Sequence, residues 1–407
     1  MFVILKLFRK SYKLPIYLLA LLIVLVMRSI RPYLVVRIGG LISSRIGHFA
    51  GNTELYLCER DAGINIPEQR YIDLFYFAGG SIANLQLAKM WRRVLRVGPS
   101  WLLAPVSRVN ASIPGGRAHN AFAATREVDI HNLLERFPTH LQFTPEEESR
   151  GASKLKAMGI PIGAKFVCLM VRDSAYLDKQ FEGTSFERHN YRDSAIQTYV
   201  LAANSLAEKG FFVIRMGAIV RSKFIATHPR IIDYATNGMR DDFMDIYLGA
   251  HCVFCLSTGT GWDSVPEMFR RPIAYVNFVP LGNLHTFRND YLSLVKKHIF
   301  ITTQAVLTLN EIFENHVAFG LTTSTYEQLG VALIDNTPEE IQAVAVEMAD
   351  RVTGAWRDSG EDEILQKRFW QIYKAKVSQL NDNRVMHGDL RGRYSAAFLR
   401  ENPHWLL

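Results

Sequence analysis

The second half of the chain alternates between continuous apolar runs and segments with a helical period. Apolar runs, typical of strands buried on both faces, occur at 165–171, 211–216, 252–256 and 272–277. Amphipathic patterns that predict helices lie at 195–209, 244–250 and 262–269. A strand at 331–334 and a helix at 337–352 follow, the helix opened by the capping pair Thr337 and Glu340. This alternation predicts an α/β domain with a parallel sheet covered by helices on both faces.

The first half shows the same kind of alternation with less regularity. We expect strands at 33–38, 55–58 and 72–77. A helical pattern covers 82–95, whereas the many Pro, Gly, Ser and Asn residues at 99–120 indicate a loop. Thr144 opens a polar helix that ends at Gly159, and we place a domain boundary there. The predicted domains therefore span 32–158 and 159–407.

The first 31 residues have a composition of their own. Residues 14–27 carry no charge, but this run is shorter than the roughly 20 residues that span a bilayer. Basic residues flank it, and residues 2–13 mix apolar and basic side chains as interfacial amphipathic helices do. We expect residues 1–31 to be a monotopic or peripheral membrane segment on the cytoplasmic face of the inner membrane. A buried core helix with basic ends is the alternative.

The distribution of charge changes what the overall basicity means. The 407 residues include 47 Lys and Arg and 39 Asp and Glu, a net charge of +8 that would ordinarily suggest nucleic acid. Eight of the basic residues and none of the acidic ones lie in residues 1–53, so the rest of the chain is electrically balanced. A nucleic-acid-binding protein carries its basic surface on the folded body. We therefore expect no nucleic-acid partner.

Composition narrows the class of protein further. Hydrophobic residues make up 48% and charged residues 21%, which excludes a disordered chain and a polytopic membrane protein. Four cysteines are too few for a disulfide scaffold. Cys252 and Cys255 form a C-x-x-C inside an apolar strand, where positions i and i+3 face opposite sides. That placement predicts core cysteines rather than a redox or zinc motif, and it fits a reducing cytoplasm.

The strongest candidate for ligand binding is the segment that follows the strand at 252–256. It combines two glycines with three hydroxyl residues, as Ser257, Thr258, Gly259, Thr260 and Gly261. Ligands of open α/β sheets bind at the carboxyl ends of strands, and backbone N–H groups at a helix start favour a phosphate. The glycine spacing fits neither a Walker A loop nor a G-x-G-x-x-G motif. We expect phosphate contact here, and a plain strand-to-helix turn is the alternative.

Two arginines end strands of the same predicted domain. Arg215 follows a wholly apolar strand and precedes Gly217, and Arg172 ends the strand at 165–171. A guanidinium offers a planar fork for phosphate oxygens, so both arginines are candidate phosphate ligands. For Arg172, the alternative is a structural ion pair with its neighbour Asp173.

A polar segment between a strand and a helix supplies a further candidate surface. It contains His189, Asn190, Tyr191, Arg192 and Asp193. Polar loops held by a rigid scaffold commonly bind substrates, so we assign this segment to substrate binding. The alternative is a solvated loop in which Asp193 or Ser194 caps the next helix.

The glycine-flanked segment after the first strand holds Arg45 and His48. We take both as candidate catalytic residues, with His48 as a base or substrate ligand because histidine titrates near neutral pH. A structural histidine is the alternative. The paired acids Asp241 and Asp242 are explained by a helix N-terminus. No zinc, calcium or Walker pattern occurs elsewhere in the sequence, so we expect no metal and no cofactor.

Several of these segments together resemble a known family. The segments that carry the likeness begin at Arg45, His189, Val213, Asp242, Ser257 and Asp335. They resemble a bacterial family that is assigned to the glycosyltransferases and occurs in surface-polysaccharide gene clusters. That family is similar to the GT-B superfamily, which implies two Rossmann-like domains that face a central cleft and require no metal. The likeness covers most of the chain and implies no particular sugar.

The resemblance implies where each substrate would bind. The second domain would hold a nucleotide-sugar donor, with Arg215, Gly217 and Ser257–Gly261 at its diphosphate and Glu267 near its ribose. The first domain would bind a glycan or lipid-linked acceptor, with His48 deprotonating its hydroxyl. The predicted function is membrane-associated transfer of a sugar to a cell-surface polysaccharide. A GT-B-fold nucleotide-sugar epimerase and a non-catalytic scaffold of a polysaccharide assembly complex are the alternatives.

Overall fold

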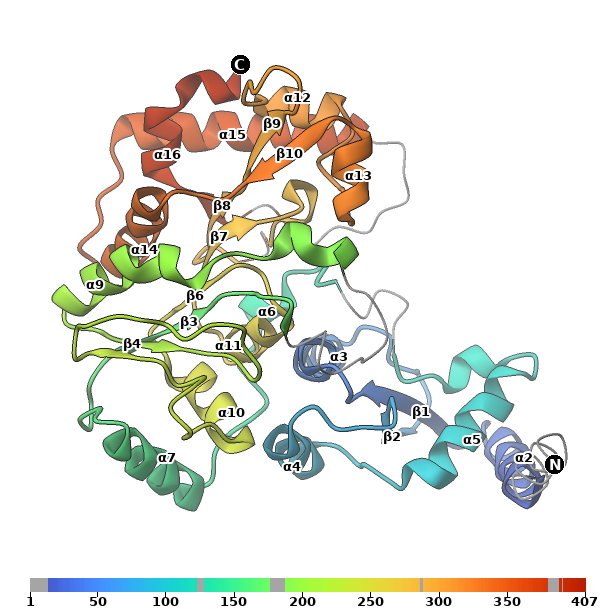
Figure 1. Ribbon diagram of the computed structural model, residues 1–407. Coiled ribbons are helices and arrows are strands. Elements are labelled where there is room, and N and C mark those ends of the chain that lie inside the picture. Colours follow the sequence, from blue (N-terminus) through green and yellow to red (C-terminus); the bar gives the residue numbers. More distant parts are fainter. Residues whose placement is uncertain (1–13, 123–127, 176–186, 286–287, 380–387, 390) are drawn as a thin grey trace, which may run out of the picture. The chain divides into compact units, whose positions relative to one another are not determined.

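The computed structural model describes residues 14–122, 128–175, 187–285, 288–379, 388–389 and 391–407 (Figure 1). Contacts within the chain divide it into two compact units. Unit 1 comprises residues 1–128 and 139–142, and unit 2 comprises residues 129–138 and 143–407. The predicted domain boundary lies later, after residue 158.

Helix α7 (Pro145–Ala157) accounts for this difference. It begins where the sequence predicts, because the Thr144 side chain accepts a hydrogen bond from the backbone of the first turn. The helix packs on α10 (Asp242–His251) of unit 2. Gly151 lies so close to the Tyr247 ring that a β-carbon there would come within 2.2 Å of it. A capping motif predicts where a helix starts but not which unit the helix packs on.

A seven-stranded parallel sheet forms the core of unit 2. Its strands, in the order in which they lie side by side, are β11 (Arg393–Tyr394), β8 (Leu292–Val295), β7 (Ile273–Phe278), β6 (Cys255–Ser257), β3 (Phe166–Met170), β4 (Phe212–Arg215) and β5 (Ile231–Ile232). All neighbouring pairs are parallel. The predicted α/β fold with a parallel sheet is confirmed, and β7, with six buried residues, shows the double-sided burial that its apolar run indicates.

Helices cover both faces of this sheet. α9 (Val200–Glu208) and α14 (Pro338–Thr353) pack together on one face, and α10 and α11 (Ser264–Met268) lie on the other (Figure 1). α14 starts at the predicted capping pair. The other named helices and strands of unit 2 are α6 (Leu133–Arg136), β9 (Lys297–Phe300), α12 (Leu309–Glu314), α13 (Thr323–Gln328), β10 (Val331–Ile334), α15 (Gly360–Gln379) and α16 (Ala396–Glu401).

The strand order reverses beside β3. The chain runs from β3 outwards to β4 and β5, then returns to the other side of β3 and continues outwards through β6, β7 and β8. Ligands of open α/β sheets bind at such a reversal, because the connections that leave the two central strands diverge. The carboxyl ends of β3 and β6 are therefore the place in unit 2 where the fold favours a ligand.

Unit 1 contains a smaller parallel sheet of β1 (Val35–Ile42) and β2 (Tyr71–Ala78). Isolated bridges extend it at Asn120 beside β1 and at Val97 beside β2. The predicted helix at 82–95 is observed as α4 (Leu85–Val94).

Two predicted elements of unit 1 are wrong. Residues 55–58 belong to a helix, α3 (Thr53–Asp61), in which seven successive residues are buried, so the apolar run has neither the alternation of a strand nor a one-sided helical stripe. Residues 100–111 form α5 (Ser100–Ala111) rather than a loop. α5 packs on α2 (Leu14–Ser29), and that contact stabilises a helix in spite of Pro105.

One face of α2 packs against the rest of unit 1, and the opposite face is exposed. Ala20, Val24 and Met27 contact Leu103 and Val106 of α5. The exposed fractions of seven apolar side chains on this helix lie between 38% and 61%, at Leu14, Leu18, Leu19, Leu21, Leu22, Leu25 and Val26. No helix in the described part of the chain is long and apolar enough to cross a membrane. The predicted interfacial helix at 2–13 lies outside the described residues.

Arg37, one of the eight N-terminal basic residues, is used inside the fold. The register of β1 and β2 places Arg37 opposite Asp73, and two bonds of 2.6 Å join the guanidinium to both carboxylate oxygens. Both residues are buried, and Tyr56 donates a further hydrogen bond to Asp73. Arg37 therefore contributes no charge to a membrane-facing surface.

All four cysteines are free and buried, as predicted for core cysteines. Cys255 lies in β6, whereas Cys252 caps the end of α10 and does not belong to the strand.

Candidate functional site

The site begins where β3 and β6 end, at the reversal of strand order in unit 2. Thr258 follows β6, and its backbone N–H donates to the Met170 carbonyl of β3 at 3.2 Å. Its hydroxyl oxygen accepts a hydrogen bond of 2.9 Å from the backbone N–H of Arg172, which follows β3. The structure thus brings together two segments that the sequence analysis assigned separately to phosphate binding.

The loop at 257–261 is held from within by a carboxylate that the sequence analysis missed. Asp263 accepts hydrogen bonds from Ser257 Oγ at 2.7 Å and from Thr260 N and Oγ1 at 2.6 and 3.0 Å. Burial raises the pKa of Asp263 to about 6, against the opposing effect of these donors and of the Arg192 charge. The hydroxyls of Ser257 and Thr260 therefore fix the shape of the loop. The helical segment that follows the loop is short: a single turn begins at Gly261 and leads into α11, which has five residues.

Two guanidinium groups meet at this loop. Arg192 donates a hydrogen bond to the Gly259 carbonyl, and the Nε of Arg172 lies 3.3 Å from Asp193 Oδ1. Burial and the nearby charge of Arg192 lower the pKa of Arg172, which means that the two cations destabilise one another. Among the described residues, no carboxylate lies within ion-pair distance of Arg192. A half-buried cationic pair of this kind attracts an anion with several acceptor oxygens.

A lysine that the sequence analysis missed lies further along the same sheet edge, paired with an aspartate. Lys296 follows β8 and is buried, and its Nζ donates to the Asp193 carbonyl at 2.7 Å. Lys296 Nζ also lies 2.7 Å from Asp335 Oδ1. The other carboxylate oxygen of Asp335 accepts a hydrogen bond from the Ser194 hydroxyl. The Ser194 hydroxyl therefore bonds to Asp335 and does not cap the helix that follows this loop. A charged residue directly after an apolar strand is the signal that could have identified Lys296.

Arg215 is placed differently from its predicted role. Its side chain is 1% exposed and pairs at 3.1 Å with Asp233, which directly follows β5, so the guanidinium links the ends of β4 and β5. Gly217 lies in the connection between these two strands, beside Val220. This geometry does not favour Arg215 as a phosphate ligand, and Arg172 and Arg192 take that role in our proposal. Arg172 pairs with Asp193 and not with its neighbour Asp173.

Glu267 lies on α11 and is buried. Tyr291 donates a hydrogen bond of 3.2 Å to Glu267 Oε1, and burial raises the pKa of this carboxyl to about 7. Its predicted contact with a ribose stays a prediction.

The predicted substrate loop is a 3-10 helix over Glu187–Arg192. Tyr191 is buried against Tyr326, and Tyr191 N donates to Thr323 Oγ1 at 3.3 Å. His189 accepts a hydrogen bond from Arg188, and Asn190 is exposed. Tyr191 therefore anchors the loop, and the adjacent Arg192 lies within hydrogen-bond distance of the Gly259 carbonyl.

The predicted catalytic residues Arg45 and His48 lie in unit 1. Arg45 is exposed, and His48 starts the π-helical turn His48–Asn52, a feature that is frequent at functional sites. Asn52 Nδ2 lies 3.3 Å from His48 Nδ1, so the two side chains contact one another within this turn. The role of His48 as base stays a prediction.

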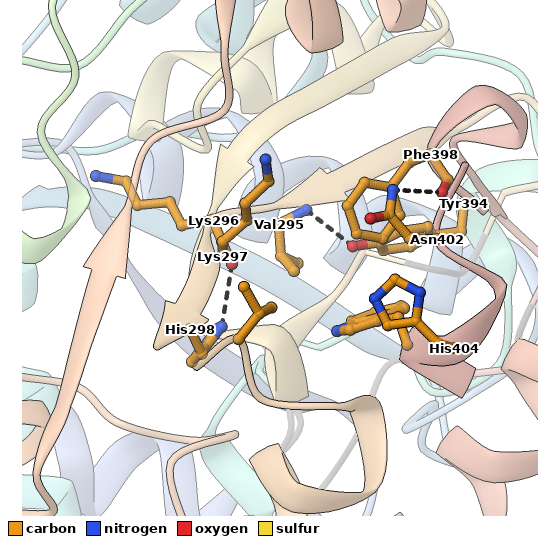
Figure 2. Close-up of a pocket in the computed structure, with 10 residues that line it drawn as sticks. Val295, Lys296, Lys297, His298, Tyr394, Phe398, Asn402 and His404 are labelled. Carbon is orange, nitrogen blue, oxygen red and sulfur yellow. Dashed lines mark hydrogen bonds between the residues drawn. The ribbon is translucent and has the colours of Figure 1, made fainter. Parts of the chain in front are cut away.

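A small pocket of about 90 Å³ adjoins Lys296 (Figure 2). Its walls come from the start of β9 and from the C-terminal residues Tyr394, Phe398 and Trp405. His298 Nδ1 donates to the Lys296 carbonyl at 3.0 Å, and burial lowers the pKa of His298 to about 4, so the ring is neutral. Its Nε2 has no hydrogen-bond partner among the described residues. The pocket has room for a few water molecules or one small polar group.

No protein-family model matches the sequence, and no curated protein matches it. Several solved structures are similar to the chain, and three of them follow. E. coli ADP-heptose lps heptosyltransferase II has a TM-score of 0.43 and 13% identity, and the match covers 77% of this chain and 99% of that one. A glycosyl transferase family 9 protein from Veillonella parvula has a TM-score of 0.37 and 9% identity, with coverages of 60% and 81%. E. coli heptosyltransferase WaaC with ADP-2-deoxy-2-fluoro heptose has a TM-score of 0.29 and 12% identity, with coverages of 63% and 92%.

Proposed function

We propose that this protein is a glycosyltransferase whose unit 2 binds the diphosphate of a nucleotide-sugar donor. The observation that carries the proposal is the pair of guanidinium groups, Arg172 and Arg192, beside the loop at the strand reversal. A diphosphate offers the multiple acceptor oxygens that two neighbouring guanidinium groups need.

The same pair explains how the reaction would be accelerated. Breaking the bond between sugar and diphosphate leaves negative charge on the departing phosphate oxygen. Arg172 and Arg192 are already in place and partly shielded from water, so they would stabilise this charge more in the transition state than in the ground state. The ordered loop at 257–261 would keep its backbone in position without reorganising during the step.

The acceptor side of the proposal rests on unit 1. We assign acceptor activation to the segment of Arg45 and His48, and we take the acceptor to be a glycan or a lipid-linked glycan. The exposed apolar face of α2 and the absence of acidic residues from 1–53 support attachment to an anionic membrane surface. The protein would then act at the cytoplasmic face of the inner membrane, where lipid-linked acceptors are within reach.

Nucleotide binding by the full-length protein tests the donor site. Thermal shifts with ADP, UDP, GDP and CMP should identify one preferred nucleotide, since a ligand that binds the native state raises its stability. Arg192→Gln should weaken binding of that nucleotide by about tenfold or more, because one charged hydrogen bond is worth roughly 1.5–3 kcal/mol. Arg215→Gln is the matched control: it should lower the melting temperature but leave the affinity of the folded protein unchanged.

Transfer from labelled nucleotide-sugars to a glycan acceptor then tests the reaction. Loss of transfer in Arg192→Gln with normal stability would support the proposal. Absence of any nucleotide binding in the wild-type protein would overturn it and favour a scaffold. Interconversion of nucleotide-sugars without an acceptor would overturn transfer and favour an epimerase.

A further inference from the structure

Three side chains with metal-ligating atoms converge inside unit 1. Glu54 and Cys58 lie one turn apart on α3, and His140 comes from the segment 139–142. One carboxylate oxygen, the sulfur and one ring nitrogen of these residues all lie within 4.8 Å of one another. Glu54 Oε1 is 3.1 Å from His140 Nδ1 and 4.0 Å from Cys58 Sγ. Zinc bonds of about 2.0–2.3 Å in a tetrahedral site hold ligand atoms roughly 3.3–3.7 Å apart, so these two separations lie within about half an ångström of those in a zinc site.

The other nitrogen of the same imidazole is held by a carboxylate. His140 Nε2 lies 2.9 Å from Asp61 Oδ2, on the next turn of α3. A zinc-ligating histidine typically donates its second N–H to such a carboxylate, which fixes the tautomer and directs the remaining lone pair at the metal. The arrangement therefore has both the ligand atoms and the supporting contact of a metal site.

The charges of the cluster match a divalent ion. A glutamate, a thiolate and a neutral imidazole around M²⁺ give a site without net charge, which suits the full burial of Glu54 and Cys58. The sulfur and imidazole ligands favour zinc over magnesium or calcium. Asp61 is balanced separately by Arg60, at 3.0 Å.

We propose that Glu54, Cys58 and His140 bind one zinc ion in unit 1, with water as the fourth ligand. The ion replaces two protons, the thiol proton of Cys58 and the Nδ1 proton that His140 shares with Glu54 Oε1, and it leaves Nε2–H to donate to Asp61. It joins α3 to the segment 139–142, which belongs to unit 1 although the residues on either side of it in the sequence belong to unit 2. The site lies in unit 1 and shares no residue with the donor site in unit 2.

Cobalt substitution in the full-length protein tests the thiolate ligand directly. The chelator-treated protein should take up one equivalent of Co²⁺, with visible bands of tetrahedral intensity and a thiolate-to-cobalt charge-transfer band in the near ultraviolet. One equivalent of Zn²⁺ should abolish these bands. Absence of the charge-transfer band in the wild-type protein would overturn the proposal and leave His140 as an ion-pair partner of the two carboxylates.

Variants assign the ligands. Cys58→Ser should lose the charge-transfer band, whereas Cys252→Ser, a buried cysteine of unit 2, should retain it. Asp61→Asn should keep one equivalent of zinc but bind it about 10–100-fold more weakly, as the loss of a supporting carboxylate typically does. Persistence of the band in a folded Cys58→Ser protein, verified by circular dichroism, would equally overturn the assignment.

Discussion

Gly259 shows how closely a single residue of the donor loop is constrained. Its φ of 82° lies in the left-handed region, and a β-carbon there would come within 2.9 Å of the Phe278 ring. The backbone conformation and the packing of β7 therefore each require glycine at this position.

Gly259→Ala is expected to lower the free energy of unfolding by about 1–2 kcal/mol from the backbone conformation alone, with a further loss from the contact with Phe278. Gly159→Ala is a matched control, because Gly159 has a φ of 81° and no heavy atom within 4 Å of its β-carbon position. Urea denaturation of both variants measures the difference. Equal losses in the two variants would show that Phe278 imposes no restriction.

Glu267 should make the stability of unit 2 depend on pH. Burial raises the pKa of Glu267 from 4.5 to about 7, so between these values the folded state binds more protons than the unfolded state. The stabilisation is complete below pH 4.5 and is lost as the pH rises through 7. Glu267→Gln removes this contribution, which is on the order of 1–3 kcal/mol.

Chemical denaturation of the wild-type protein and Glu267→Gln at pH 5 and pH 8 measures this effect. The wild-type protein should lose more stability over this interval than the variant does. Asp263 has a shift of the same sign and its charge contributes to the shift of Glu267, so the difference between the two proteins includes the interaction of these two carboxyls. An identical pH dependence in both would contradict the raised pKa.

Three arginines show what a sequence can and cannot establish about a site. Arg172, Arg192 and Arg215 could all be predicted as candidates, because each follows an apolar strand or lies in a polar loop. Their ranking depends on burial and on partners elsewhere in the fold. Arg215 is 1% exposed and paired with Asp233, whereas Arg172 is 15% exposed beside Asp193 and Arg192 contacts a backbone carbonyl. Asp263 and Lys296 escaped prediction because a carboxylate was not expected in a phosphate loop and β8 was not predicted.

At the scale of elements, α2 presents an apolar stripe of Leu18, Leu22 and Leu25, spaced by four and three residues along the helix. Replacing all three by glutamate should reduce binding to vesicles that contain anionic lipid by about 100-fold or more, since burial of each leucine is worth roughly 1.5–3 kcal/mol. Vesicle cosedimentation measures the change.

The control for this prediction is Ile162→Glu in unit 2, where the side chain is exposed and lies outside α2. It should leave vesicle binding unchanged. Undiminished binding by the triple variant would contradict a membrane role for this face of α2, because the packed face formed by Ala20, Val24 and Met27 is not altered.

The elements that were predicted incorrectly have a common cause. α3 is buried over most of its length and α5 contains Pro105, so local pattern and local propensity both pointed away from helix. Packing against the sheet and against α2 decides their conformation. The helices with capping pairs, α7 and α14, were predicted correctly because their start is encoded within four residues.

At the scale of the whole molecule, the buried pair of Arg37 and Asp73 provides a way to perturb unit 1 alone. Asp73→Ala leaves an uncompensated guanidinium inside the sheet, and it should destabilise unit 1 by about 3–5 kcal/mol. Scanning calorimetry of the full-length protein should show one transition moving to lower temperature while the other is unchanged.

Lys209→Ala is the control, because it removes an exposed ion pair with Asp350 that should contribute less than about 1 kcal/mol. Equal displacement of both transitions by Asp73→Ala would show that the two units unfold together. That result would contradict their independence as cooperative units.

The sequence by itself determined the α/β class, the alternation of strands and helices from β3 to β7 in unit 2, the loop at 257–261 and the unusual N-terminus. These features depend on apolar periodicity, capping pairs and charge, which are local properties of the chain. Only the tertiary structure decided the unit to which α7 belongs, the arginines that approach the loop, and the meeting of Glu54 and Cys58 with His140. Each of these depends on contacts between residues far apart in the sequence, where no local pattern records which partner a side chain finds.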